Sequence, residues 1–179
     1  MQHRIIKLAI FLLLFQPSFA QDSLNMERVG MWNPPNMPVF GGVTFNDVWG
    51  YTASDGSEYG IIGNVDSIMV IDVTNPATPV REYGYDGGNS AIWRDFKVHN
   101  DHLYAVCDGC SEGLHIFDLS ALPNGDVSHV TTTTQFFSRA HNIFIDTLSQ
   151  RLYAAGTNTV SEGLVVLDIS VPGQPTLLA

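Results

Sequence analysis

The sequence predicts an all-β protein, a partial β-propeller of about three four-stranded antiparallel blades that is incomplete at its C-terminal end. The first observation is a repeat, because SEGLHIFDLS at 111–120 returns as SEGLVVLDIS at 161–170 with six of ten positions identical. A fainter third copy is VDSIMVIDVT at 65–74, and the copies are 46 and then 50 residues apart. Each copy holds only short apolar runs between turn-forming dipeptides, which favours strands over helices. Strand-rich repeats of this period are typical of propeller blades.

The first twenty residues have the pattern of a secretory leader. MQHRIIK carries positive charge, LAIFLLLF is an apolar core, and small residues precede the end at Ala20. The apolar core is far shorter than the roughly 20 residues that a membrane-spanning helix requires. The sequence therefore predicts a Sec-type signal peptide at 1–20, a secreted or cell-surface protein, and no transmembrane span.

Residues 21–44 are expected to form a separate opening segment. RVGMW at 28–32 alternates in a way that suits one strand, and Pro34, Pro35 and Pro38 follow it. Pro-rich sequence does not continue a strand ladder. We therefore expect an N-terminal strand and a Pro-rich loop.

The blades are expected at about 45–90, 91–137 and 138–179. FNDVWGY, WRDFKVH and AHNIFID align as the innermost strands, near Val48, Phe96 and Ile143. The chain reaches PTLLA where a fourth strand of the last blade is due. Because propellers close with about four to eight blades, we expect the third blade to be incomplete and the protein to be truncated at its C-terminus.

Aspartates close the repeated ten-residue stretch in all three copies. Asp72, Asp118 and Asp168 are each followed two residues later by Thr or Ser. Carboxylates at such positions accept hydrogen bonds from nearby backbone N–H groups and end strands in turns. We interpret the three aspartates as turn residues rather than as ligands.

With the repeat laid out, the chain resembles the choice-of-anchor B family, whose propellers carry LVIVD repeats. The resemblance covers about Phe45 to Leu178 and rests on six stretches in order: FNDVWGY, YGIIGNVDSIMVIDVTNPATPV, WRDFKV, GLHIFDLSALPN, AHNIFIDTLSQRLYAAGTN and GLVVLDIS. It implies an extracellular or surface-displayed propeller, carried in different relatives on different C-terminal anchoring tails. Surface anchoring through such a tail, beyond the present sequence, is an expectation from this resemblance.

The charge of the chain argues against nucleic acid as a partner. Without Arg4 and Lys7 of the leader, six basic residues remain against eighteen acidic ones, a net charge of −12. Proteins that bind a phosphate backbone need clustered positive charge. The acidity is explained by the solubility of an exported protein.

Candidate binding residues lie where the innermost strands begin. If these strands line a channel, six side chains converge on its mouth: Asn46, Asp47, Arg94, Asp95, His141 and Asn142. Oxygen ligands of this kind suit Ca²⁺ or Mg²⁺, and an imidazole also accepts a transition metal. In the alternative interpretation, the aspartates and Asn142 bond backbone donors of the adjacent blade and Arg94 neutralises a carboxylate.

Cys107 and Cys110 in CDGC are the only cysteines. In an exported protein such a pair is usually oxidised, so we expect a local disulfide across the Asp108-Gly109 turn, with both sulfurs near the surface. A redox pair and half of a zinc site are the alternatives. No further zinc ligands are evident near this loop.

The leading functional hypothesis is a non-enzymatic, exported scaffold that binds an extracellular protein or glycan at or outside the cell surface. The alternative is a cation-dependent, lactonase- or glycosidase-like hydrolase, with Asp47, Asp95 and Asn142 as ligands and a nearby acid or His141 as base. No G-x-S-x-G or H-E-x-x-H motif is present. We predict no cofactor for the scaffold, while the hydrolase would hold Ca²⁺ in the channel.

Overall fold

The computed structural model describes residues 26–159 and 163–179 of the 179-residue chain. This part contains three four-stranded antiparallel sheets and no helix. The all-β fold with three antiparallel four-stranded blades is therefore confirmed. No segment of the described part is a helix that could cross a membrane. The predicted leader at 1–20 lies outside the described residues.

Each sheet is built from four strands that follow one another along the chain. The first sheet contains β1 (Phe45–Thr52), β2 (Glu58–Asn64), β3 (Ser67–Asp72) and β4 (Val80–Asp86). The second contains β5 (Arg94–His99), β6 (His102–Cys107), β7 (Leu114–Asp118) and β8 (Ser128–Thr133). The third contains β9 (Asn142–Asp146), β10 (Arg151–Ala155), β11 (Leu164–Asp168) and β12 (Thr176–Leu177).

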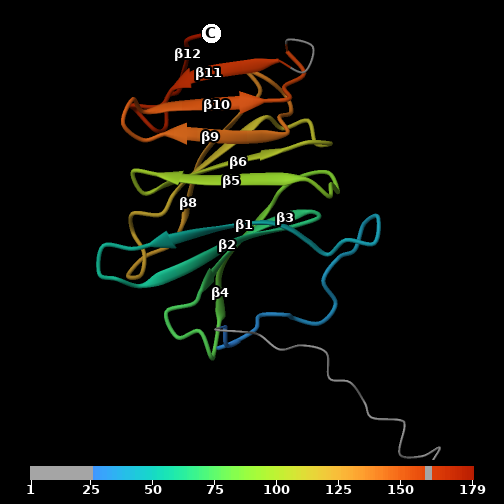
Figure 1. Ribbon diagram of the computed structural model, residues 1–179, viewed down its shortest axis with the longest axis vertical. Coiled ribbons are helices and arrows are strands. Elements are labelled where there is room, and N and C mark those ends of the chain that lie inside the picture. Colours follow the sequence, from blue (N-terminus) through green and yellow to red (C-terminus); the bar gives the residue numbers. More distant parts are fainter. Residues whose placement is uncertain (1–25, 160–162) are drawn as a thin grey trace, which may run out of the picture.

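The first strands of the three sheets adjoin one another, β1 beside β5 and β5 beside β9 (Figure 1). Val48, Phe96 and Ile143 lie in these strands, as the repeat alignment predicted. The three sheets therefore meet along their first strands, in a propeller-like arrangement of three blades.

Two hydrophobic cores lie between successive sheets, and the second sheet contributes to both. In β6, Leu103 and Ala105 pack in the core shared with the first sheet, while Tyr104 and Val106 pack in the core shared with the third. Alternating side chains of one strand point to opposite faces of its sheet. A strand whose two faces are both covered needs apolar residues at every position, which explains the unbroken apolar run LYAV.

The repeated aspartates close turns, as the sequence predicted. Asp72, Asp118 and Asp168 each accept a hydrogen bond from the backbone N–H two residues later, at 2.8, 2.8 and 2.9 Å. The acceptor holds the chain in a turn directly after β3, β7 and β11. These carboxylates have a structural role in every blade.

The outer faces of the first and third sheets differ. On the first sheet, Met69 is 1% and Ile71 3% exposed, although no other sheet of the described residues packs on this face. On the third sheet, Phe144 is 63% and Leu164 53% exposed. By register, Leu164 occupies the place of Leu114, which is fully buried between the second and third sheets. The third sheet thus presents to solvent a face that the second sheet buries.

The third blade is the least complete of the three, as the sequence predicted. Its fourth strand is present as β12, which pairs with β11 through Leu167–Leu177 and Asp168–Thr176. Only two residues of this strand are formed. Leu178 and Ala179 continue the contact with hydrogen bonds to the Val166 backbone.

The strand expected at Arg28–Trp32 is not formed, since these residues lie outside all twelve strands. Gly30 instead packs against the backbone between β3 and β4, so closely that a Cβ atom there would lie 1.6 Å from the Pro76 carbonyl oxygen. The Trp32 ring lies 5.9 Å from that of Phe45. Because the segment contacts a loop and side chains rather than a free strand edge, no ladder forms.

Candidate functional site

A hollow of about 290 Å³ lies where the innermost strands begin, and we call it the mouth. Five of the six predicted residues line it, and Asp95 does not. The lining residues are Asn46, Asp47, Ile92, Trp93, Arg94, His141 and Asn142. The repeat alignment therefore brought together residues that are nearly 100 positions apart in the sequence.

The two aspartates of the innermost strands connect successive sheets. Asp47 Oδ2 accepts a hydrogen bond of 2.8 Å from the backbone N–H of Phe96. Asp95 Oδ2 accepts the equivalent bond, 2.6 Å long, from the N–H of Ile143. The two aspartates therefore have the role given in the alternative interpretation of the sequence: each carboxylate accepts a hydrogen bond from a backbone N–H of the next blade. We call these contacts the interblade clamps.

The two clamp carboxylates lie close enough to influence each other's protonation. Burial raises the pKa of Asp47, against the hydrogen bonds from the Phe96 and Val48 N–H groups, which lower it. The neighbouring charge of Asp95 raises the pKa of Asp47 further. Lys97 forms an ion pair with Asp95 and lies 4.4 Å from the centre of the Trp49 ring. A fixed cation thus offsets the second clamp's charge.

Arg94 binds backbone carbonyls rather than a carboxylate, which corrects part of the sequence-based interpretation. Its Nε donates to the Asn64 carbonyl at 3.0 Å and its Nη2 to that of Val65 at 3.2 Å. The side chain is buried, and burial lowers the pKa of Arg94. These two carbonyls lie at the end of β2, in the first sheet, while Arg94 begins β5 in the second. The Arg94 side chain therefore connects the two sheets.

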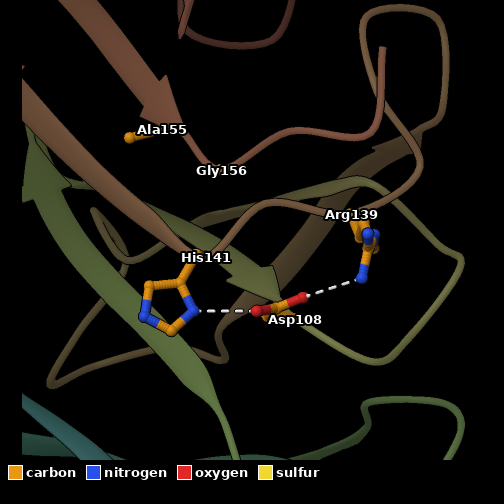
Figure 2. Close-up of a pocket in the computed structure, with 5 residues that line it drawn as sticks. All are labelled: Asp108, Arg139, His141, Ala155 and Gly156. Carbon is orange, nitrogen blue, oxygen red and sulfur yellow. Dashed lines mark hydrogen bonds and ion pairs between the residues drawn. The ribbon is translucent and has the colours of Figure 1, made fainter. Parts of the chain in front are cut away.

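His141 borders the mouth and a second pocket of about 330 Å³, which is also lined by Asp108, Arg139, Ala155 and Gly156. Figure 2 shows the imidazole and Arg139 on either side of the Asp108 carboxylate. His141 Nδ1 lies 2.8 Å from Asp108 Oδ2, and Arg139 Nη1 donates to Oδ1 at 3.3 Å. The second ring nitrogen of His141 points away from Asp108 (Figure 2). Asp108 therefore orients the ring, and within the described part of the chain the second nitrogen has no hydrogen-bond partner, so it is available to a ligand.

Sequence reasoning did not identify Asp108 and Arg139 as site residues. Asp108 lies between the two cysteines in CDGC, where it was interpreted only as part of a turn. It is 33 positions from His141 in the sequence, and no repeat relates the two residues. The flanking cysteines were the one feature of the sequence that could have indicated a fixed position for Asp108.

Cys107 and Cys110 are joined by a disulfide, with Cα atoms 5.4 Å apart. The expectation that both sulfurs lie near the surface was wrong, since both residues are buried against Ala91. The loop packs on Ala91, which lies in the connection between β4 and β5. In the described residues no group of three or more His, Cys, Asp or Glu side chains is arranged to hold a metal ion.

The remaining lining of the mouth is an aromatic ring with polar neighbours. Trp93 is 53% exposed, and Asn142 and His141 are also exposed. In the described part of the chain the Asn142 side chain makes no hydrogen bond, unlike Asp47 and Asp95 at the equivalent positions. Asn46 is committed, because its Nδ2 donates to the carbonyls of Asn64 and Ala91.

Comparison with known protein families gives one match, at the C-terminal end of the chain. Residues 159–179 match the LVIVD repeat. The matched segment includes β11 and β12, whose sequence LVVLD at 164–168 is the one that recurs as LHIFD in β7 and SIMVID in β3. No curated protein matches the chain. The LVIVD repeat and the three sheets together indicate a repeat protein of the β-propeller type.

Proposed function

We propose that this protein is an exported, non-enzymatic β-propeller of the choice-of-anchor B kind, which binds a partner at or outside the cell surface through its mouth. Export is supported by the leader-like sequence at 1–20 and by the CDGC cysteine pair. The chemistry of the mouth favours a glycan over a protein as the partner.

The observation that supports this proposal is that some mouth residues are bonded within the protein while others are exposed to solvent. Asp47 and Asp95 are committed to the interblade clamps, and Arg94 to backbone carbonyls. The exposed groups that remain are the Trp93 ring, the Asn142 amide and the His141 imidazole. An aromatic face beside neutral hydrogen-bonding groups suits a sugar ring, whose apolar face stacks while its hydroxyls donate and accept.

A glycan array with the purified protein tests the proposal, using Trp93→Ala as the variant. Trp49→Ala is the matched control, because Trp49 is also exposed but does not line the mouth. We expect the wild type to bind at least one glycan, Trp93→Ala to weaken this binding by at least about tenfold, and Trp49→Ala to retain it. Glycan binding that survives in Trp93→Ala, or no glycan binding by the wild type, contradicts the proposal.

The hydrolase remains a second candidate because of the contact between His141 and Asp108. A carboxylate on one ring nitrogen orients a histidine to act as a base through the other. A Ca²⁺ ion bound by Asp47, Asp95 and Asn142 would have to compete with the interblade clamps. Assays with lactones and aryl glycosides in the presence of Ca²⁺ test this candidate. Turnover that is lost in both His141→Asn and Asp108→Asn would establish it.

A further inference from the structure

A third hollow, of about 360 Å³, lies between the first and second sheets; we call it the interblade cleft. Its walls come from the end of β4, the loop before β7 and the strands β7 and β8. The lining residues are Tyr85, Asp86, Gly88, Glu112, His115 and Thr132. It shares no lining residue with the mouth.

Three buried polar atoms in or beside the interblade cleft have no hydrogen-bond partner among the described residues. Glu112 Oε2 and His115 Nε2 belong to its lining, and the third is Nη1 of Arg94, a residue that lines the mouth. His115 is only 2% exposed. Its Nε2 lies 3.9 Å from Glu112 Oε2, which is too long for a hydrogen bond. Buried polar groups are nearly always satisfied, so three such atoms in one place require an explanation.

Two glycines bring these side chains together. A Cβ atom on Gly87 would lie 2.8 Å from Arg94 Nη1, and one on Gly88 would lie 1.8 Å from Glu112 Oε1. Gly88 also has a φ of 81°, a conformation that favours glycine. The two residues after β4 are therefore glycines because a larger side chain there would clash with the Arg94 guanidinium or the Glu112 carboxylate.

The protonation of His115 decides what its free nitrogen can do. Burial and the charge of Arg94 lower the pKa of His115 to about 4, so the ring is neutral at neutral pH. His115 Nδ1 and His129 Nε2 both bond Thr132 Oγ1, at 2.9 and 2.8 Å. The hydroxyl has one hydrogen, so it donates to one ring and accepts from the other. His115 Nε2 is therefore an acceptor in one arrangement and a donor in the other.

Charged ligands suit only part of this set. A metal ion would satisfy Glu112 and an accepting His115 but would face the Arg94 guanidinium. An anion would satisfy Arg94 but would face the Glu112 carboxylate. A hydroxyl group both donates and accepts, so adjacent hydroxyls satisfy all three atoms in either arrangement of His115. We propose that the interblade cleft is a binding site for a small neutral polyhydroxyl molecule, a monosaccharide or polyol, held by Glu112, His115 and Arg94.

The His115 side-chain NMR resonances of the purified protein test this site in titrations with D-glucose, D-galactose, myo-inositol and glycerol. We expect a saturable shift with at least one of these probes. Binding should weaken by at least about tenfold in Glu112→Gln and remain in Glu58→Gln, whose carboxylate is exposed on β2. If Glu112→Gln does not fold, Glu112→Asp, which keeps the charge and shortens its reach, serves the same comparison.

Three outcomes overturn the proposal. No saturable shift with any probe means that water alone occupies the cleft. An equal shift in wild type and Glu112→Gln means that the sugar acts elsewhere. A saturable response to zinc chloride or sodium sulfate, without one to the sugars, means that the cleft binds an ion. Arg94 lines the mouth but is unchanged in every variant, and Glu112 does not line the mouth, so these results are distinguishable from those of Trp93→Ala for the proposed function.

Discussion

Asp95 accepts a 2.6 Å hydrogen bond from the backbone N–H of Ile143, 48 residues further along the chain. Asp47 has the same relation to Phe96. The same acidic side chain thus joins the first strand of one sheet to the first strand of the next at both boundaries. A carboxylate in this position links the blades where their strands are closest, so it is part of the scaffold beneath the mouth.

Replacing the clamp carboxylate should destabilise the fold. We expect Asp95→Ala to lower the free energy of unfolding by about 2–3 kcal/mol, because it leaves the buried Ile143 N–H without its acceptor and removes the ion pair of Lys97, which keeps only the Phe96 carbonyl. Urea denaturation measures the change, with Glu82→Gln on the exposed side of β4 as the control. If Asp95→Ala is as stable as Glu82→Gln, the interblade clamp does not contribute to the stability of the fold.

The free energy of unfolding should decrease as the pH is lowered, because of His115. Its pKa is about 4 in the folded protein and about 6.5 in the unfolded chain, so below pH 6.5 protons bind preferentially to the unfolded state. Between about pH 7 and pH 4.5 this contribution should cost about 2–3 kcal/mol. Burial is the main cause of this lowered pKa, and the charges of Arg94 and His129 lower it further; Glu112 lies 3.9 Å from the ring.

The His115→Gln variant isolates this effect. Asp47 acts in the opposite direction, since its raised pKa lets the folded state take up a proton first as pH falls. We therefore compare the pH dependence of unfolding in wild type and His115→Gln rather than the wild-type curve alone. The variant should lose less stability on acidification. Parallel curves for the two proteins would show that His115 is not the group responsible.

The exposed face of the third sheet should drive self-association. Leu164 exposes an apolar side chain at a position that the second sheet buries, and Phe144 of β9 is also largely exposed. We expect the wild type to sediment as oligomers in analytical ultracentrifugation, and the double variant Phe144→Ser, Leu164→Ser to shift toward monomer. Val80→Ser is the control, because Val80 is similarly exposed but on β4. A monomeric wild type at all concentrations would contradict this prediction.

The cysteine loop should affect the position of His141. The disulfide of Cys107 and Cys110 closes the loop that carries Asp108, whose carboxylate contacts the His141 ring. Alkylation without reductant, followed by mass analysis, should find no free thiol in protein recovered from the periplasm or medium. The double variant Cys107→Ser, Cys110→Ser should shift the His141 ring resonances. Two alkylated thiols in the wild type would exclude the disulfide.

The repeat predicted the blades well because it fixed both period and register. Once SEGLHIFDLS and its copies were aligned, the positions of the innermost strands followed, and so did the convergence of Asn46, Arg94 and His141. The strand expected at Arg28–Trp32 failed because alternation describes a strand but does not supply an edge for it to pair with. Asp108 was not predicted because it lies in a loop outside the repeated stretch. The interblade cleft was not predicted because it joins Glu112 and His115 of that stretch to Tyr85 and Thr132 of outer strands, which the alignment of the copies does not place.

The central claim is that the aspartates of the innermost strands clamp the blades and that the mouth binds its partner without a cation. Elemental analysis of the purified protein, before and after the Asp47→Asn substitution, tests this most directly. We expect calcium, magnesium and transition metals well below one ion per chain in both proteins, because the Asp47 and Asp95 carboxylates are occupied by backbone N–H groups. One metal ion per wild-type chain that is lost in Asp47→Asn would contradict the account and favour the hydrolase.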